Sequence, residues 1–501
     1  MRAAEHAAAR GRCVLYLVPE IALTPQLAHA LGERFGERVV VMHSSLNDRQ
    51  RFDAWQRARR GRARIVVGAR SALFAPLERL GLLIVDEEHD GGYKQEESPR
   101  YQARDLALVR GRAAGAVVVL GSATPSMEAW LSADEHRSAR IVLPERVGGG
   151  ALPEVELVDM RSEFRETGED RPLSRRLTAA LRETIASGEQ AMVLINRRGY
   201  TRVLLCRACG EAISCIACSI ALTWHRVGRR LMCHYCGYSS ARPQDCPACR
   251  SPYLADIGFG TQRAEREIAE AVPGARIERL DRDAVRSPRT LARVLGGFSR
   301  GEIDVLVGTQ MIAKGHHFPR VTLVGVLSAD AGLRLPDFRA GERTMQLLTQ
   351  VAGRAGRGDR PGRVIVQAFR PEHPALRAGL AQDYEGFAER ELAARKMLRY
   401  PPAAALANLI VRDTQQEKAF ERGAQLAERI REAGEGKVAV LGPSAAPRAR
   451  LREQWRVQLL VRAVKRRRLV DALRRALGEL TGSRGAFPRW LIVDIDPHQL
   501  L

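Results

Sequence analysis

The chain has 501 residues, of which 45% are hydrophobic, so it is long enough for several globular domains and is not a disordered chain. No apolar stretch approaches the roughly 20 residues of a membrane-spanning helix and no secretory signal is recognisable, so we expect a cytoplasmic protein. The formal net charge of +22 favours a polyanion such as nucleic acid. Only six of the 80 basic residues are lysine, however, and a genome that encodes arginine freely would give the same excess.

The N-terminal part of the chain alternates helical and apolar segments. Residues 1–10 have helical composition and end at Gly11, and a short apolar run follows at 13–18. Strands separated by helices predict an α/β fold with a parallel sheet, in which chemistry gathers at the carboxyl ends of the strands. The further apolar runs lie at 39–42, 64–68, 82–86 and 117–121.

One of these strands ends in two adjacent carboxylates, Asp86 and Glu87, followed by Glu88 and His89. Such a pair is costly at the end of an apolar strand unless a cation lies opposite. Mg²⁺ bound to a nucleotide would supply that charge, with Asp86 holding the metal's water shell and Glu87 orienting the attacking water. A capped, solvated loop start is the alternative interpretation.

Eight of the nine cysteines lie between residues 206 and 249, as four Cys-x-x-Cys pairs. Two thiolates three positions apart can bind one metal from a tight turn, so four pairs offer two tetrahedral four-thiolate zinc sites. Closed sites of this kind leave no open coordination position, which predicts structural zinc. Four disulfides are the alternative, but such frameworks belong to small secreted domains.

Three pairings of these cysteines are conceivable. Joining neighbouring pairs would leave five residues between Cys209 and Cys215, which is cramped beside the usual ribbon spacing of roughly 15 to 20. A nested arrangement brings the two pairs of each site together more easily, and the interleaved pairing is not excluded. In the nested arrangement one zinc takes the outer pairs, Cys206, Cys209, Cys246 and Cys249, and the other takes the inner pairs, Cys215, Cys218, Cys233 and Cys236.

A second α/β unit begins at the apolar run 191–196, is interrupted by the cysteines, and reaches residues 350–357. Arg354 and Arg357 are three positions apart there, so on a helix they share one face. Flanking Ala and Gly residues let a second backbone approach closely. The pattern suits two arginine fingers that reach a triphosphate, and an arginine-rich solvated helix is the alternative.

From Pro401 onward the predicted order is strand, helix, strand, strand, helix, strand, which is that of a ferredoxin-like α+β domain. Basic residues surround Trp455 in this region. They would bind phosphates while the indole stacks a base, although a solvated face is equally compatible with the pattern. The predicted elements are 405–411, 415–431, 437–441, 455–461, 466–480 and 490–495.

Together these pieces resemble the PriA family of primosomal replication-restart helicases (primosomal protein N′), which belong to helicase superfamily 2. The resemblance covers about residues 1 to 501. Its most specific part is the eight-cysteine insertion, because other superfamily 2 helicases generally lack it. The motifs that carry it are 18–26 (Ia), 86–89 (II), 121–125 (III), 308–318 (V) and 350–357 (VI).

The resemblance implies an ATP-dependent 3′–5′ DNA helicase of replication restart and primosome assembly at stalled forks. Its implied cofactors are two Zn²⁺ and ATP with Mg²⁺. Its implied partners are forked or single-stranded DNA, single-stranded-DNA-binding protein and primosome loader proteins, with no membrane. The implied domains are two RecA-like lobes, 1–160 (incomplete) and 161–205 with 251–400, a double-zinc insertion, 206–250, and a C-terminal ferredoxin-like domain, 401–501.

The resemblance also assigns roles to single residues and implies the nested zinc pairing. Residues 93–101 resemble the family's aromatic loop, which couples DNA contact to hydrolysis, but Ser98-Pro99 stand where family members often have a further aromatic residue. The catalytic residues would be Asp86, Glu87, Arg354 and Arg357, and the nucleotide-binding ones Glu88, His89, Gly315 and Gln350. The DNA-binding residues would be Pro19, Thr24, Gln26, Arg70, Tyr93, Lys94, Tyr101, Thr309, Lys314 and Trp455.

One departure from the family is large. Family members carry a P-loop, Gly-x-x-x-x-Gly-Lys-[Ser/Thr], just before the helix that opens this chain, and DNA-binding domains upstream of it. The sequence contains no such loop, whose amides and lysine cradle the β- and γ-phosphates. Either the native protein starts further upstream, or the chain is a zinc-dependent DNA- and partner-binding scaffold without ATPase activity. A first lobe without its P-loop strand would expose a sheet edge, which favours the longer protein.

Overall fold

The computed structural model describes most of the chain, and the described residues form two compact units, one up to Arg140 and one from Ile141 onward. Among them, no helix has the length and apolar character that crossing a membrane requires. Six predicted site residues lie outside the described part: Thr24, Gln26, Cys218, Lys314, Gly315 and Arg357. The residues that are not described are 1, 20–30, 45, 144–152, 197–202, 218–220, 226–227, 235, 257–260, 282–283, 286, 310–311, 313–317, 336, 356–360, 481–486 and 501.

A five-stranded parallel sheet forms the first unit, as the alternating runs predict. Its elements are α1 (Arg2–Ala9), β1 (Cys13–Leu17), η2 (Gly36–Arg38), β2 (Val39–Met42), α3 (Asp48–Arg59), β3 (Ile65–Gly68), η3 (Arg70–Phe74), β4 (Leu80–Asp86), η4 (Gly91–Tyr93), α4 (Ala103–Ala114), β5 (Val117–Gly121) and α5 (Met127–Asp134). The strand order is β2-β3-β1-β4-β5. Leu15 and Leu17 of β1 pack on the face that α3 and α4 cover, and Val14 packs on the face of α1. Because both faces are covered, the strands are continuous apolar runs in the sequence.

β5 is an edge strand of this sheet, and it is less covered than the central strands. Among the described residues only β4 pairs with it. Val117 and Val119 are 64% and 42% exposed, whereas Val14 and Leu15 of the central strand β1 are fully buried. An edge strand offers unpaired N–H and C=O groups to a further strand. The described residues therefore leave part of this edge strand exposed.

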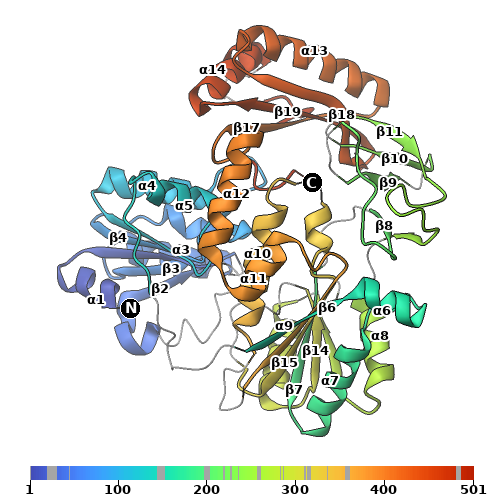
Figure 1. Cartoon of the computed structure of the whole chain (residues 1–501). Coiled ribbons are helices and arrows are strands. Elements are labelled where there is room, and N and C mark those ends of the chain that lie inside the picture. The colour runs from blue at the N-terminus through green and yellow to red at the C-terminus, as the bar shows by residue number, and fades with distance from the viewer. Residues whose placement is uncertain are drawn as a thin grey trace. The chain divides into compact units, whose positions relative to one another are not determined.

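A six-stranded parallel sheet forms the core of the second unit, in the order β13-β14-β7-β15-β16-β6. Its elements are β6 (Glu154–Asp159), α6 (Met160–Thr167), α7 (Arg175–Ala186), β7 (Gln190–Ile195), α8 (Thr261–Ala271), β13 (Ile277–Leu280), α9 (Pro288–Arg300), β14 (Val305–Gly308), β15 (Val321–Leu327), η5 (Ala331–Arg334), α10 (Ala340–Ala352), β16 (Arg363–Ala368), α11 (Pro374–Ala381) and α12 (Tyr384–Leu398). Met192 and Leu194 of β7 pack with α9 and α10, and Ala191 and Val193 pack with α7 and α8. The sheet therefore lies between two helical layers (Figure 1).

The first lobe ends earlier than the predicted boundary at residue 160. Strand β6 lies within the predicted range of that lobe, yet it pairs in parallel with β16 and is the edge strand of the second sheet. Its residues are mostly half-buried, because only one neighbouring strand covers it. The chain therefore enters the second unit before β6.

The cysteine module is built from short antiparallel strands inside the second unit. Its elements are β8 (Leu204–Cys206), β9 (Thr223–His225), β10 (Arg230–Met232), β11 (Ser239–Ala241) and β12 (Leu254–Asp256). Strands β9, β10 and β11 form one small sheet, while β8 and β12 pair at the base, with Cys206 opposite Leu254. The chain enters the insertion along β8 and leaves it along β12, so the pairing of these strands holds the two ends of the module together. The module therefore runs from Leu204 to Asp256, slightly beyond the predicted range 206–250.

The C-terminal domain has the predicted ferredoxin-like order of elements. These are β17 (Ala405–Asp413), α13 (Gln416–Gly434), β18 (Ala439–Leu451), β19 (Gln454–Ala463), α14 (Arg466–Leu477), η6 (Gly478–Leu480) and β20 (Leu491–Ile495). The four strands are antiparallel in the order β18-β19-β17-β20. Figure 1 shows α13 and α14 together on one side of this sheet.

The other face of the C-terminal sheet packs against the cysteine module. Alternate residues of β17 divide between the two faces, since Ala407 and Leu409 join the core under the helices, whereas Leu406 joins a core with the module. On β19, Leu460 likewise faces the module. Leu500, near the end of the chain, completes this shared core. The central strands β17 and β19 are therefore covered on both faces.

Candidate active site and zinc centre

Asp86 stands at the carboxyl end of β4 with its orientation fixed by its neighbours. The Tyr16 hydroxyl, on the adjacent strand β1, donates to Asp86 Oδ2 at 2.8 Å, and the Glu87 amide donates to Oδ1 at 3.0 Å. Burial and the nearby Asp86 carboxylate raise the pKa of Tyr16, so this hydroxyl keeps its proton. Tyr93 adds a hydrogen bond of 2.7 Å from its hydroxyl to the Asp86 carbonyl oxygen. A carboxylate held in this way is preorganised to face a cation.

Glu87 has a left-handed backbone conformation, with φ of 47°. This region costs a residue other than glycine about 1–2 kcal/mol, and such strain concentrates at functional sites. One Glu87 carboxylate oxygen lies 3.5 Å from His89 Nδ1, which in turn lies 2.7 Å from the Ser122 hydroxyl. Motif II and motif III are therefore joined through His89 beside the two carboxylates.

Glu88 forms a buried network with α4 and the start of α5. Its oxygens accept hydrogen bonds from the Ser126 amide, from the Ser126 hydroxyl at 2.9 Å, and from Arg104 Nη1 at 3.3 Å. Arg104 also donates to the Ser126 hydroxyl oxygen at 2.6 Å, and Ser126 caps α5. Burial raises the pKa of Glu88, against the opposing effect of the Arg104 charge. Both oxygens accept hydrogen bonds inside the protein, so Glu88 positions motif II in this structure, while its contact with a nucleotide stays a prediction.

We expect Arg104→Met to lower the free energy of unfolding of the first unit by about 3–5 kcal/mol, because it leaves the Glu88 carboxylate buried without its cation. Urea denaturation of the variant and the parent protein would measure the loss. The double variant Glu88→Gln/Arg104→Met removes both charges and should recover part of it. An Arg104→Met protein as stable as its parent would contradict the assignment.

The segment that resembles an aromatic loop is fastened to the sheet. Arg70 of η3 donates to the Gly92 carbonyl oxygen at 3.1 Å and to that of Lys94. Tyr93 is 1% exposed and Lys94 is also buried. The buried ring has no exposed face on which a base could stack in this conformation, and the Tyr93 hydroxyl holds the loop to Asp86. That Tyr93 contacts DNA stays a prediction. Tyr101, at the end of the loop, is half-buried and packs against Phe74.

The remaining predicted DNA and nucleotide residues that the structure describes are dispersed. Pro19 is buried after β1, and Thr309 is half-buried after β14. Gln350 lies near the end of α10, and Arg354 follows that helix, with its amide donating to the Val351 carbonyl oxygen. Trp455, on β19, is half-buried, with the Arg450 guanidinium 5.7 Å from its ring centroid. Their roles stay predictions.

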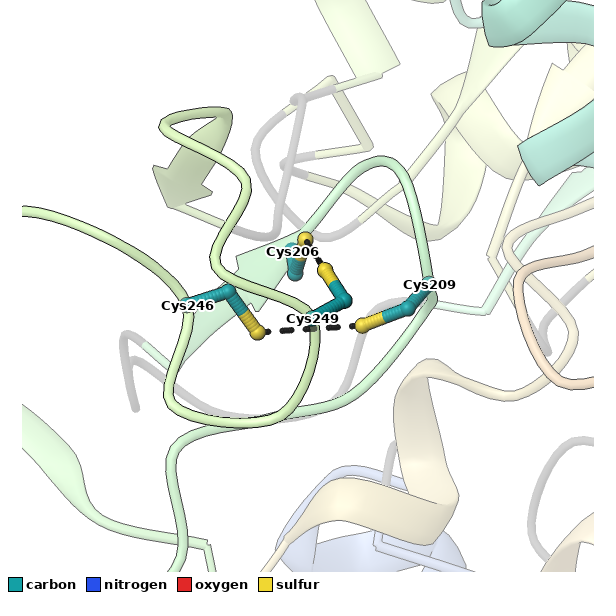
Figure 2. A group of neighbouring side chains, drawn as sticks. All are labelled: Cys206, Cys209, Cys246 and Cys249. Atoms are coloured by element: carbon teal, nitrogen blue, oxygen red, sulfur yellow. Dashed lines mark hydrogen bonds between the residues drawn. The ribbon is translucent and has the colours of Figure 1, made fainter.

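Four cysteines of the outer pairs converge on one point (Figure 2). Cys206 Sγ lies 3.5 Å from Cys249 Sγ, and Cys209 Sγ lies 3.7 Å from Cys246 Sγ. Four thiolates around a tetrahedral zinc with bonds of ~2.3 Å lie roughly 3.8 Å apart, whereas a disulfide requires about 2.05 Å. The spacing and the all-sulfur donor set therefore fit zinc.

A second group contains Cys215, Cys233 and Cys236, whose ligand atoms lie within 4.8 Å of one another. Cys215 Sγ and Cys236 Sγ are 3.7 Å apart. Cys218, the fourth predicted ligand, lies outside the described residues. Among the described residues, the first group contains both outer pairs and the second contains three of the four inner cysteines, which agrees with the nested arrangement.

His234, between two cysteines of the second group, connects the module to β18. Its Nδ1 lies 2.8 Å from the Ala445 carbonyl oxygen, and because a carbonyl only accepts, Nδ1 carries the proton. His234 Nε2 is then an acceptor, for which His225 Nε2 at 3.3 Å is the donor. The Ser444 hydroxyl adds a hydrogen bond of 2.9 Å to the His234 carbonyl oxygen. Burial lowers the pKa of His234 to about 4, so the ring is neutral. Neither His225 nor His234 was predicted from the sequence to have a structural role.

Comparison with known proteins identifies relatives of this chain. Models of four families match: DEAD/DEAH box helicase (2–130), PriA DNA helicase Cys-rich region domain (215–240), helicase conserved C-terminal domain (260–359) and primosomal protein N C-terminal domain (396–498). The replication restart protein PriA of Treponema pallidum is 43% identical over 100% of this chain and 75% of its own length. The chain belongs to the PriA family. The PriA protein of Bacillus subtilis is 42% identical over 100% of this chain and 62% of its own length.

This chain therefore spans about three fifths of the Bacillus subtilis PriA relative. Family membership confirms the resemblance drawn from the motifs, including the fold of RecA-like lobes, cysteine-rich zinc region and C-terminal domain. Among solved structures, one described as RecG bound to a three-way DNA junction superposes on 76% of this chain and 40% of its own, with a TM-score of 0.42 and 15% identity. Likeness at that level is too low to assign a fold by itself.

Proposed function

We propose that this chain is the motor body and C-terminal part of an ATP-dependent 3′–5′ DNA helicase that acts in replication restart and primosome assembly at stalled forks. The observation that carries the proposal is the Asp86–Glu87 pair at the carboxyl end of β4, fixed by Tyr16 and joined to motif III through His89, in a member of the PriA family. Carboxylates in this position are the groups that a Mg²⁺-nucleotide requires.

The residues at and around motif II have distinct parts in this mechanism. Asp86 would hold the water shell of Mg²⁺, and Glu87 would orient the water that attacks the γ-phosphate. Glu88 and Arg104 keep motif II and the start of α5 in register. By resemblance to the family, Arg354 and Arg357 of motif VI would be the arginine fingers that place guanidinium charge on a triphosphate and stabilise the transferring phosphoryl group.

The two cysteine groups would each hold one structural zinc. Zinc in a closed four-thiolate site supplies folding energy and no open coordination position for chemistry. The module that it folds covers one face of the C-terminal sheet. DNA, single-stranded-DNA-binding protein and primosome loader proteins are the partners that we propose from family membership. The net charge of +22 supports the first of these, and it predicts DNA binding that weakens steeply with salt.

We expect this chain to be inactive as an ATPase by itself, because its sequence has no Gly-x-x-x-x-Gly-Lys-[Ser/Thr] loop to seat the phosphates. The exposed edge at β5 supports the view that a further segment completes the first sheet. ATP hydrolysis should be measured for the zinc-loaded chain, with and without forked DNA, beside a version that extends upstream through any in-phase P-loop. DNA-stimulated hydrolysis only in the longer version is the expected result.

The missing loop also favours a second candidate function, a zinc-dependent scaffold that binds DNA and partners without hydrolysing ATP. The same experiment separates the two. Salt-sensitive DNA binding with no hydrolysis in either version would support the scaffold and contradict the helicase.

A further inference from the structure

Phe74 ends the short helix η3 and is 60% exposed. A single exposed apolar residue on a surface is ordinary and needs no function. Phe74 differs in how firmly its backbone is fixed. The residues before and after it, Leu73 and Ala75, are buried, so the exposed ring projects from an anchored backbone.

Two arginines fasten this backbone. Arg110 of α4 donates to the carbonyl oxygens of Leu73 and, at 2.6 Å, of Ala75, so one guanidinium bridges the residues on both sides of Phe74. Arg70, at the start of η3, donates to the carbonyl oxygens of Gly92 and Lys94. The position of Phe74 is therefore fixed relative to both α4 and the segment after motif II. A site that is preorganised in this way loses little entropy on binding.

Tyr101 supports the ring from one side. The two ring centroids are 5.4 Å apart and the planes are inclined by 84°, an edge-to-face arrangement. Such a contact occupies an edge or one face of Phe74 and leaves at least one face open, in agreement with its exposure. Tyr93, the other aromatic residue of the loop, is buried, and Ser98-Pro99 provide no ring. Phe74 is thus the most exposed aromatic side chain of this cluster.

We propose that Phe74, supported by Tyr101, is a stacking platform for one base of single-stranded DNA. Every base has a π face, so an exposed ring binds bases with little sequence preference, while Arg100, next to Tyr101 in the chain, would suit a phosphate. The inference rests on the proposed DNA-binding function and adds to it a specific residue and ligand group. It assigns an aromatic contact with DNA to η3, where the ring is exposed, whereas Tyr93 is buried in this structure.

The test is binding of a fluorescein-labelled oligothymidylate to the zinc-loaded chain, followed by anisotropy. Phe74→Ala should weaken binding by about 5- to 150-fold, and Phe74→Trp should keep the affinity of the parent chain. The slope of log Kd against log salt should stay unchanged, because no charge is removed. Phe52→Ala is the matched control, since Phe52 on α3 is 59% exposed in the same unit, and it should stay within twofold.

A second measurement assigns the contact to a base. Single abasic sites are moved along the oligonucleotide, and at one position the abasic site should weaken binding to the parent chain but not to Phe74→Ala. Phe74→Ala binding within twofold of the parent, or Phe74→Trp as weak as Phe74→Ala, would overturn the platform. A parent chain that does not bind single-stranded DNA would overturn the proposed function as well, and that outcome is visible before any variant is tested. Circular dichroism shows that each variant is folded.

Discussion

Glu87→Gln, in a version of the protein that includes a P-loop, is expected to lower DNA-stimulated ATP hydrolysis by about 10²- to 10⁴-fold. Glutamine keeps the shape of the side chain but loses the negative charge that orients and activates the attacking water. Nucleotide binding should change little, because the change acts on the transition state more than on the ground state. Steady-state hydrolysis with saturating forked DNA, together with equilibrium binding of a non-hydrolysable ATP analogue, measures the two effects separately.

Glu78→Gln is a suitable control for this experiment, because Glu78 is an exposed carboxylate just before β4 and lies outside the motifs. Its hydrolysis rate should match that of the parent protein. Unchanged hydrolysis in Glu87→Gln would remove Glu87 from the mechanism. A loss of nucleotide binding as large as the loss of hydrolysis would instead mean that Glu87 holds the metal shell, the role that we assign to Asp86.

Cys206→Ser is expected to reduce bound zinc from two ions per chain to one and to unfold the module around the lost site. Three thiolates bind the metal far more weakly than four, and metal binding in such modules, at about 10–16 kcal/mol, provides the folding free energy. The damage should spread, because Cys206 belongs to the same core as Leu406 and Leu460 of the C-terminal sheet. Elemental analysis gives the zinc content, and binding of a hydrophobic dye reports the exposed sheet face.

Cys13→Ala is the control for zinc content. Cys13 is the cysteine outside the module, buried on β1 of the first unit, and its removal should leave both zinc ions in place. Cys206→Ser protein that retained two zinc ions per chain would contradict the outer four-cysteine site. A change from two ions to none would show that the two sites fold as one.

The sequence was sufficient to predict the elements that a short stretch of residues identifies by its own pattern. The strands β1, β3 and β7 are buried on both faces, so each is a continuous apolar run in the sequence. The C-terminal order followed from helices with one apolar face, such as α14, between apolar strands. The cysteine pairs could be grouped because two ligands three residues apart are already neighbours before the chain folds.

Features that depend on distant contacts could not be predicted in this way. β6 has a mixed, half-buried pattern, and its partner β16 lies about two hundred residues further along the chain. The burial of Tyr93 depends on its hydrogen bond to the Asp86 carbonyl oxygen, and that of Glu88 on Arg104 and Ser126. Phe74 is an ordinary apolar residue in the sequence. Its significance comes from Arg110, which lies on a helix beyond the next strand.

The shared core between the cysteine module and the C-terminal sheet has a consequence for synthesis on the ribosome. The last strand of the module, β12, ends at Asp256, but Leu460, against which the module packs, is made about two hundred residues later. At a synthesis rate of ~5–20 residues per second, the apolar side of the module stays exposed for roughly 10 to 40 s before Leu460 is made. A nascent chain that captures zinc early gains a folded module with an exposed apolar side during that interval. Newly made protein is therefore most exposed to wrong association before its C-terminal domain emerges.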